Sequence, residues 1–403
     1  MNILFVHRSF PAQFQYLSLV LANNPKNNVV FIAEEDCGEI PNVKKVIYKL
    51  DKEISKDCHP CLVRYEQSII IAQAVADAAL KLKNEGFKPD VIYGFSAWGS
   101  TMFLKDVFPD VPLISYCEWF GFADGPESKF DGRVFDEKDR EKIRCGNSNL
   151  LIDLYSCDAA ITPTQWQKQQ FPKEFHDKIR VIHDGIDVIT CKPDAEAKFL
   201  IPEKNLELTI KDEVVTYGTR ALELYRGFPQ FMQTVEKLLK KRPNTQVIVA
   251  GDDVTCYGSG LENETYKNLA LKELDIDLER VHFVGKLNFL DYIKLLQISS
   301  VHVYLTYPYI LSWSMLNAMS TGCCVVASNT PPVGEVIQDN YNGLLVDFFN
   351  INQIVEKIEY ALDNQDKVLQ IRNNARQTVL DKYELKKLVL QQISFLMEVV
   401  AKN

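Results

Sequence analysis

The sequence predicts an α/β protein built from two doubly wound parallel sheets. Short apolar runs alternate with longer segments of helical periodicity along all 403 residues. The short runs are almost entirely apolar, as expected for strands covered by helices on both faces. A polar segment with prolines, residues 192–213, interrupts this alternation near the middle of the chain. The length and this interruption together favour two large domains.

The expected strands and helices follow one another in the same order in both halves. In the first half we expect strands at 2–6, 29–33, 91–94, 113–116, 159–162 and 180–182, helices at 65–83 and 148–156, and an exposed charged excursion at 124–144. In the second half we expect strands at 214–217, 246–250, 281–284, 301–305, 324–328 and 344–346, and helices at 227–241, 290–298, 312–321 and beyond 351. The expected domains are 1–195 and 196–380, with 381–403 as a helix that returns to the first domain.

Composition and charge exclude several classes of protein. Hydrophobic residues make up 46% and charged residues 25%, which argues against disorder, collagen and coiled coil. The 45 basic and 54 acidic residues give a net charge of −9, so a nucleic acid is a poor candidate partner. No run of about 18 apolar residues occurs, and His7 and Arg8 come too early for a signal peptide. We therefore expect a cytoplasmic protein, with contact at the inner face of the membrane as a second option.

Three loops that follow expected strands are candidate ligand sites, because open parallel sheets bind ligands beyond the carboxyl ends of their strands. The loop 7–14 lacks the G-x-G-x-x-G pattern of dinucleotide folds, so NAD is not supported. The loop after Tyr217 carries Arg220 and Arg226 next to a helix start, which suits a diphosphate. The alternative is two solvated surface arginines. The segment 307–322 alone indicates a buried helix that ends at a glycine.

Several motifs in order resemble the nucleotide-sugar half of family 4 glycosyltransferases. They are YGTR (217–220), RG (226–227), GD (251–252), HFVG (282–285), NAMSTG (317–322), VVAS (325–328) and NGLLV (342–346), preceded by the linker-like VIHDGID (181–187). The resemblance implies a GT-B fold, with two Rossmann-like domains facing across a cleft and the C-terminal helices packed back on the N-terminal domain. It also implies that the C-terminal domain binds the donor and the N-terminal domain the acceptor.

Four further motifs are similar to a bacterial subgroup linked to polysaccharide and glycoconjugate synthesis. They are FPAQF (10–14), WG (98–99), TPTQW (162–166) and LSWS (311–314).

The resemblance implies roles for individual residues. Arg220 and Arg226 match the family's Arg and Lys that hold the donor diphosphate and stabilise its leaving charge. The other implied donor contacts are Gly218, Thr219, Asp252, Val284, Gly285, Leu311, Ser312, Trp313, Ser314 and Asn317. Tyr309 and Asn317 stand where the family usually has two glutamates. Asn317 can still bond a ribose hydroxyl, whereas Tyr309 cannot act as a carboxylate.

The N-terminal half carries the implied acceptor side. Glu118 is the nearest match to a histidine that family members place near the reacting carbon, and its alternative is a surface carboxylate. Phe10, Pro11, Gln13, His59 and Trp98 are the expected acceptor or cleft residues. Cys58-His59-Pro60-Cys61 is a candidate metal or redox motif, but no second cysteine pair completes a zinc site. We expect no metal and no cofactor.

The implied reaction is transfer of a sugar, with retention, from a nucleotide diphosphate sugar to a hydroxyl group. A UDP-sugar is favoured and a GDP-sugar is next. The departing diphosphate, neutralised by Arg220 and Arg226, would take the proton of the acceptor hydroxyl. Glycan, lipid-linked and protein acceptors remain open.

Two other classes of protein are alternatives. A GT-B epimerase or phosphorylase is one, although no Schiff-base lysine motif supports the pyridoxal type. A non-catalytic sugar-nucleotide or glycan-binding scaffold is the other, motivated by Tyr309 and Asn317.

Overall fold

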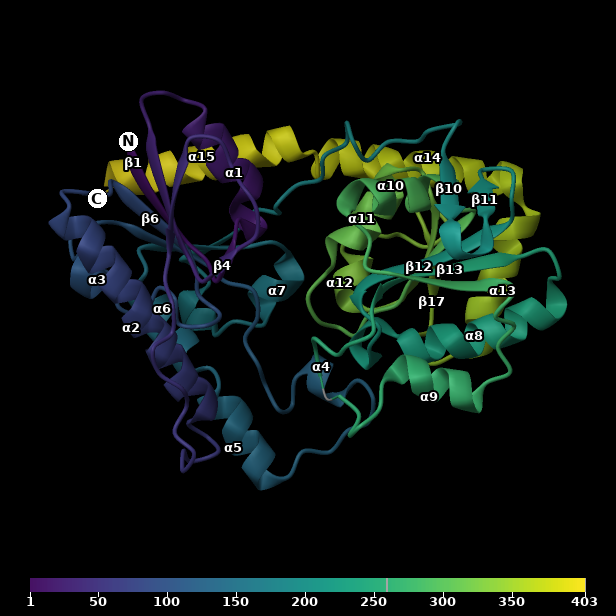
Figure 1. The fold of residues 1–403 in the computed structure, drawn as a ribbon, viewed down its shortest axis with the longest axis horizontal. Helices are drawn as coiled ribbons and strands as arrows, with labels where there is room; N and C mark the ends of the chain where they lie inside the picture. The colour runs from purple at the N-terminus through teal and green to yellow at the C-terminus, as the bar shows by residue number, and fades with distance from the viewer. Residues whose placement is uncertain (259, 403) are drawn as a thin grey trace. The chain divides into compact units, whose positions relative to one another are not determined.

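The computed structural model describes residues 1–258 and 260–402 and divides the chain into two compact units (Figure 1). The N-terminal unit is Met1–Asp184 together with the described residues from Lys386 onward, and the C-terminal unit is Gly185–Leu385. The units meet at 184/185 and 385/386, a few residues away from the expected boundaries at 195/196 and 380/381.

The N-terminal unit is built on a seven-stranded parallel sheet of order β5-β3-β1-β6-β7-β8-β9. Its strands are β1 (Asn2–Val6), β3 (Asn28–Ala33), β5 (Val43–Ile47), β6 (Val91–Phe95), β7 (Leu113–Tyr116), β8 (Ala159–Thr162) and β9 (Ile179–Val181). The two-residue strands β2 (Ser9–Phe10) and β4 (Glu35–Asp36) pair separately. Phe5 pairs in register with Phe31 on one side and Tyr93 on the other, and all three are buried. Burial on both faces explains the nearly unbroken apolar runs.

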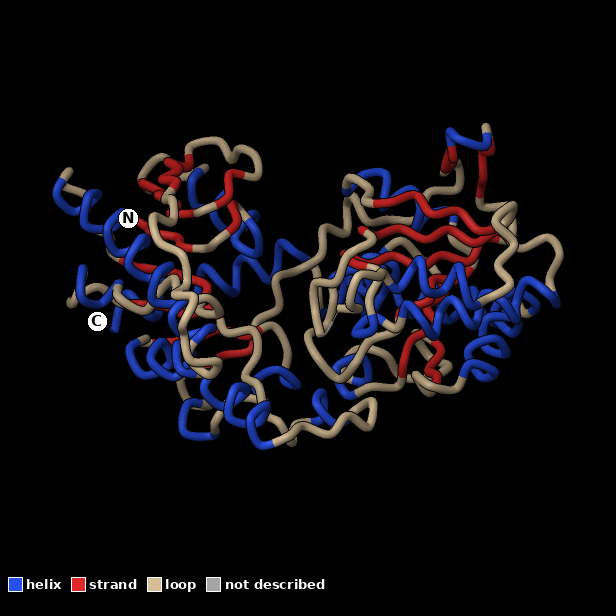
Figure 2. The backbone as a smooth tube through the Cα atoms, turned by 60° about the horizontal axis from the view of Figure 1, so that its bottom comes forward, coloured by secondary structure: helices blue, strands red, loops and turns tan. Residues whose placement is uncertain are grey.

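Figure 2 draws the helices of this unit in blue and its strands in red. The helices are α1 (Gln15–Ala22), α2 (Val63–Asn84), α3 (Leu104–Val107), α4 (Pro126–Lys129), α5 (Glu137–Cys145), α6 (Ser148–Ser156), α7 (Gln165–Gln169) and α15 (Leu385–Lys402). The expected charged excursion contains α4 and the greater part of α5, and neither helix has a buried residue. The last helix, α15, belongs to this unit because Arg180 of β9 bonds Glu398 at 2.9 Å and lies over the ring of Phe395.

The C-terminal unit has a six-stranded parallel sheet of order β14-β13-β12-β15-β16-β17. Its strands are β12 (Val214–Ala221), β13 (Gln246–Asp252), β14 (Val281–Gly285), β15 (Val301–Tyr304), β16 (Cys324–Ser328) and β17 (Leu344–Val346). Its helices are α8 (Phe228–Lys241), α9 (Tyr266–Glu273), α10 (Phe289–Ile298), α11 (Trp313–Ser320), α12 (Pro331–Gly334), α13 (Ile351–Asp363) and α14 (Gln365–Lys382).

A β-hairpin occupies the polar segment that interrupts the sequence pattern. Strands β10 (Lys198–Ile201) and β11 (Leu206–Thr209) pair in an antiparallel ladder. Phe199, Ile201 and Leu208 are buried in one cluster with residues of β12, β13 and α10. The hairpin therefore packs as part of the C-terminal unit.

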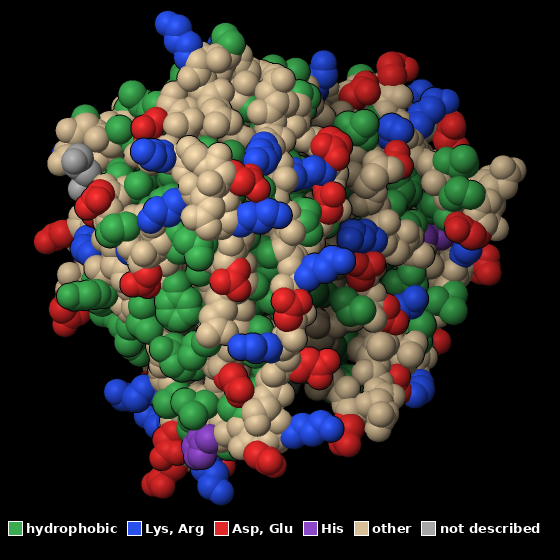
Figure 3. All heavy atoms as spheres, turned by 60° about the vertical axis from the view of Figure 1, so that its left-hand side comes forward, with side chains coloured by type: hydrophobic (Ala, Val, Ile, Leu, Met, Phe, Trp, Pro, Cys, Tyr) green, Lys and Arg blue, Asp and Glu red, His purple; other side chains and the backbone are tan. Residues whose placement is uncertain are grey.

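The strands of each main sheet all run in the same direction, so within each unit their carboxyl ends meet at one edge. The candidate loops after β1, β12 and β15 leave the sheets at these edges. No helix in residues 1–258 and 260–402 combines the length and apolarity needed to cross a membrane. On the face drawn in Figure 3, acidic and basic side chains are intermixed rather than separated into patches of one sign.

Candidate functional site

Arg226 lies buried in the loop after β12, with 7% of its surface exposed. Its Nη1 donates to the Thr306 hydroxyl at 2.8 Å and to the Ile310 carbonyl at 3.0 Å, with the Tyr304 hydroxyl at 3.4 Å. These contacts come from the segment after β15, so Arg226 joins two neighbouring strand ends. Nη1 is therefore committed to groups of the protein.

Glu223 lies between Arg220 and Arg226 in the chain and binds the loop after β13. Its Oε2 accepts the backbone N–H groups of Cys256 at 2.6 Å and Tyr257 at 2.8 Å. Burial raises the pKa of Glu223, while the two backbone N–H groups and the charges of Arg226 and Arg220 oppose that rise. Arg220 itself is exposed at the end of β12. Two guanidinium groups and one buried carboxylate therefore gather at one sheet edge.

A cluster of four tyrosines lies beside Arg226 and contacts its guanidinium through Tyr257. Tyr225 stacks on Tyr307 with ring centroids 4.7 Å apart, and the Tyr309 ring meets Tyr225 edge-on at 5.5 Å. Tyr257 contacts Tyr309 at 5.4 Å and lies 5.6 Å from the Arg226 guanidinium. Tyr309, which the sequence resemblance aligns with a glutamate, is therefore part of an aromatic wall. The wall brings together the loops after β12, β13 and β15.

The expected donor residues on strands β12 to β14 lie near this edge but differ in exposure. Gly218 is buried beneath Tyr292, whose ring atom would lie 2.7 Å from an added Cβ. Asp252 ends β13 with Lys286 at 4.0 Å. Thr219 and Val284 are half-buried, and Gly285 is exposed with φ at +65°. The lack of a side chain at Gly218 therefore lets Tyr292 pack against it. Thr219, Asp252, Val284 and Gly285 are accessible.

The remaining expected donor residues lie just before α11 or on it, and one of them caps its N-terminus. Ser312 caps α11, its hydroxyl accepting the N–H of Ser314 at 3.3 Å. The N–H of Ser312 donates to the Tyr304 hydroxyl at 2.9 Å and so is used inside the protein. Leu311 is buried and Trp313 is exposed. Asn317 is buried, and its Oδ1 accepts the Cys191 thiol at 3.6 Å.

Glu118 and Gln13 come together at the carboxyl edge of the N-terminal sheet. The Gln13 amide donates to Glu118 Oε1 at 3.5 Å, the outer limit of a hydrogen bond. Gln167 of α7 donates to the Glu118 carbonyl at 2.9 Å and fixes the backbone there. The loops after β1, β7 and β8 therefore meet around a half-buried carboxylate.

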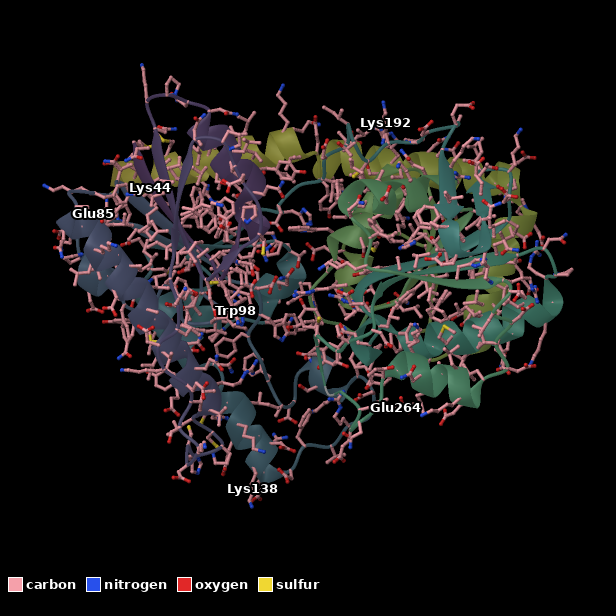
Figure 4. All side chains as sticks on the ribbon, viewed as in Figure 1. Lys44, Glu85, Trp98, Lys138, Lys192 and Glu264 are labelled. Carbon is pink, nitrogen blue, oxygen red and sulfur yellow. The ribbon has the colours of Figure 1, made fainter. Side chains whose placement is uncertain are left out.

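The remaining expected acceptor residues are divided between this edge and other places. Trp98 stacks on Phe95 at 4.8 Å and is half-buried beyond the strand ends, where Figure 4 labels it. Pro11 is also half-buried. Phe10 is 1% exposed and packs on Phe31, so it belongs to the core and offers no binding surface. His59 lies exposed before α2, where its Nδ1 accepts the N–H of Cys61.

The sequence analysis does not identify Glu223 and Tyr257. The contact partners of Glu223 lie more than thirty residues away along the chain, which no local pattern reveals. The ten cysteines are free thiols. Residues 1–258 and 260–402 contain no group of three or more His, Cys, Asp or Glu side chains arranged to hold a metal ion.

Comparison with known proteins places both halves of the chain among glycosyltransferases. Residues 25–190 match the model of the glycosyl transferase family 4 group, and residues 201–378 match that of glycosyl transferases group 1. An uncharacterized glycosyltransferase of Haemophilus influenzae is 25% identical over 59% of this chain and 61% of its own length. N,N'-diacetylbacillosaminyl-diphospho-undecaprenol alpha-1,3-N-acetylgalactosaminyltransferase of Campylobacter jejuni is 28% identical over 50% of this chain and 48% of its own. The chain thus spans about half to three-fifths of these relatives.

Solved structures share the fold over the whole chain at low sequence identity. Sucrose-phosphate synthase from Thermosynechococcus elongatus superposes with a TM-score of 0.75 and 15% identity, covering 100% of both chains. Anabaena HepE, solved in complex with UDP-glucose, gives a TM-score of 0.70 and 15% identity with the same coverage. The expected GT-B fold of two Rossmann-like α/β domains is therefore confirmed. With both family models matched, the chain belongs to the glycosyltransferases of the family 4 group.

Proposed function

We propose that this glycosyltransferase moves a sugar, with retention at the anomeric carbon, from a UDP-sugar to a hydroxyl of a glycan, lipid-linked or protein acceptor. A GDP-sugar is the second choice of donor. The observation that carries the proposal is the cluster of Arg220, Arg226 and Glu223 at one strand-end edge of the C-terminal unit. A buried guanidinium held by three neighbouring groups is preorganised to receive an anion.

The two guanidiniums stabilise the negative charge that develops on the diphosphate as the bond to the sugar breaks. This interaction strengthens in the transition state, so it lowers the barrier rather than only tightening binding. The released phosphate oxygen takes the proton of the attacking hydroxyl. No further base is then required, which is compatible with Tyr309 and Asn317 at the positions of the usual glutamates. HepE, which shares the fold, was solved with UDP-glucose, which supports UDP as the first nucleotide to test.

The experiment is a thermal-shift screen of UDP, GDP, ADP and their sugars, followed by assay of transfer and of donor hydrolysis. A ligand that binds only the folded state at a hundred times its Kd stabilises by about 2.7 kcal/mol. We expect UDP to stabilise the native chain selectively. Arg220→Ala should weaken UDP binding at least tenfold, because a charge-assisted hydrogen bond contributes about 1.5–3 kcal/mol.

The control is Lys294→Ala, since Lys294 is also solvent-exposed but lies on α10 and pairs with Asp291. This variant should bind UDP like the native chain. Selective UDP binding without transfer or hydrolysis would favour the non-catalytic scaffold. No stabilisation by any nucleotide, or equal loss in both variants, would contradict the proposed site.

A further inference from the structure

Glu223 is a buried carboxylate that binds a loop from a neighbouring strand. It follows β12, directly precedes the short helix η4 (Leu224–Arg226) and is 1% exposed. Its Oε2 accepts two backbone N–H groups of the loop after β13, from Cys256 at 2.6 Å and from Tyr257 at 2.8 Å. A carboxylate this deeply buried is unstable in its charged form unless hydrogen bonds satisfy it. Glu223 therefore attaches the loop after β13 to the loop after β12.

Close packing at the next residue holds the same two loops together. Gly258 has φ at +75°, and a Cβ added to it would lie 2.5 Å from the ring of Tyr225. The missing side chain lets the backbone after Tyr257 approach this ring. Tyr225 in turn stacks on Tyr307 with ring centroids 4.7 Å apart. The two N–H bonds and this contact are adjacent in the chain, so residues 256–258 have one defined position.

This position places the Tyr257 ring next to Arg226. The ring centroid lies 5.6 Å from the guanidinium carbon of Arg226, within the range of a cation–π contact, and 5.4 Å from the ring of Tyr309. Arg226 is itself buried and bonded through Nη1 to the segment after β15. Tyr257 adds a contact from the loop after β13. The place of its ring depends on the bond between its backbone and Glu223.

The charge of Glu223 does not favour a diphosphate at this edge. A carboxylate and a diphosphate are both negative and repel each other. The positive charges of Arg226 and Arg220 lie close enough to interact with Glu223. Attraction of the donor therefore does not explain a buried carboxylate here. The two N–H groups that it binds do explain it, because one of them belongs to the residue whose ring contacts Arg226.

We propose that Glu223 is a positioning residue of the donor site: its carboxylate holds residues 256–258 so that the Tyr257 ring fixes the Arg226 guanidinium for the donor diphosphate. This inference rests on the proposed function and deepens it, because it assigns a part of the donor site to the loop after β13. Glu223 touches neither the donor nor the reacting atoms. It acts through Tyr257, and its contribution is geometric rather than electrostatic.

Two substitutions of Glu223 separate geometry from charge. Glu223→Gln removes the charge and keeps an oxygen that can accept both N–H groups, whereas Glu223→Ala removes the acceptor as well. We expect Glu223→Ala to raise the Kd of UDP, measured by titration calorimetry, about fivefold to thirtyfold, the effect of losing a desolvated cation–π contact. Glu223→Gln should bind UDP at least as tightly as the native chain. Equal loss of binding in both variants would show an electrostatic role and would contradict the proposal.

Hydrogen exchange reports the position of the loop directly and needs no nucleotide. The amides of Cys256 and Tyr257 are protected while they are bonded to Glu223. Deuterium uptake by peptides that cover these amides, measured by mass spectrometry, should be faster in Glu223→Ala and close to native in Glu223→Gln. Unchanged uptake in Glu223→Ala would rule out the anchoring of this loop by Glu223.

Glu213 provides a matched control, because it directly precedes β12 whereas Glu223 follows it. Its carboxylate is also partly buried, and it bonds the Arg242 guanidinium and the Thr245 hydroxyl. Glu213→Ala should lower the thermal midpoint and leave the Kd of UDP unchanged, as for a structural carboxylate away from the donor edge. If Glu223→Ala has the same pattern, Glu223 is only structural and the proposal is wrong.

Tyr257→Ala tests the step from the loop to Arg226. Tyr257 is half-buried in a loop, so this variant should fold even where Glu223→Ala does not. It should weaken UDP binding as much as Glu223→Ala, and the double variant should be no weaker than either, because both act through one contact.

The outcomes separate this inference from the proposed function. Additive losses in Glu223→Ala and Tyr257→Ala would overturn the link through Tyr257. UDP binding that is native in both single variants would overturn this inference alone. A native chain that binds no nucleotide would overturn the proposed function, and the role of Glu223 in donor binding with it.

Discussion

At the scale of single residues, the two arginines of the candidate donor site differ in what a substitution would report. Arg226 is buried, and its Nη1 serves Thr306 and the Ile310 carbonyl. Removing it would leave buried acceptors unpaired and so would change folding together with binding. Arg220 is exposed, and surface substitutions usually change stability by less than about 0.5 kcal/mol. A substitution of Arg220 therefore changes diphosphate binding without a large change in folding stability.

Asp153 on α6 predicts a pH dependence of stability. It is fully buried, and within residues 1–258 and 260–402 neither carboxylate oxygen has a hydrogen-bond partner. Burial raises the pKa of Asp153 well above its usual value of 3.8. Above pH 3.8 the unfolded chain ionises this group while the folded chain keeps it protonated. The contribution of Asp153 to the free energy of unfolding therefore falls by about 1.4 kcal/mol per pH unit until the folded pKa is reached.

Asp153→Asn should remove this dependence. We expect the thermal midpoint of the variant, relative to that of the native chain, to rise between pH 4 and pH 7. The control is Asp77→Asn, because Asp77 is exposed on α2 and its replacement should leave the pH profile unchanged. Parallel profiles for Asp153→Asn and the native chain would show that Asp153 is not protonated in the folded state.

At the scale of elements, the sequence predicted most strands but few of the contacts between them. Strands β7, β8, β16 and β17 have the expected bounds because their residues are mostly apolar and nearly all buried. Strand β5, with sequence VKKVI, was missed because it is an edge strand and keeps polar residues. The β10–β11 hairpin was missed because its charged positions concealed the alternation of buried residues.

The candidate site was predictable where a motif lies within one loop and not where distant loops meet. Arg220 and Arg226 fall in one short segment with recognisable spacing. The hydrogen bonds of Glu223 depend on how β12 lies beside β13, and the contact of Gln13 with Glu118 joins residues 105 positions apart. Phe10 was predicted from its motif to line a cleft, but an aromatic side chain beside Phe31 is more stable in the core.

Gly227 lies between Arg226 and α8, and its surroundings predict the cost in stability of adding a side chain there. Its φ is +67°, and an added Cβ would lie 2.4 Å from the Cβ of Leu305. Gly285 has a similar φ of +65°, with nothing within 4 Å of the added atom. Gly285→Ala should cost about 1–2 kcal/mol of stability from backbone strain. Gly227→Ala should cost roughly 1–3 kcal/mol more, from the clash. Urea denaturation measures both, and equal costs would contradict the steric role of Leu305.

At the scale of the whole molecule, the chain leaves the N-terminal unit at Asp184 and returns to it at Lys386. The return is made by α15, whose buried side chains include Leu388, Phe395 and Leu396. The N-terminal unit is therefore discontinuous in sequence, and its stability depends on the last segment of the chain. The candidate donor site, by contrast, lies within the C-terminal unit. A change in α15 and a donor nucleotide should thus act on different units.

Differential scanning calorimetry should resolve this division as two transitions. Phe395 is 5% exposed, and replacing a buried Phe by Ala typically costs about 3–5 kcal/mol. Phe395→Ala should therefore lower the transition of the N-terminal unit by on the order of 10 °C, while UDP raises only the other transition. Leu390→Ala is the control, because Leu390 lies on the same helix but is 57% exposed, and it should shift neither transition by more than about 2 °C. A single transition moved by both Phe395→Ala and UDP would show instead that the two units unfold as one cooperative body.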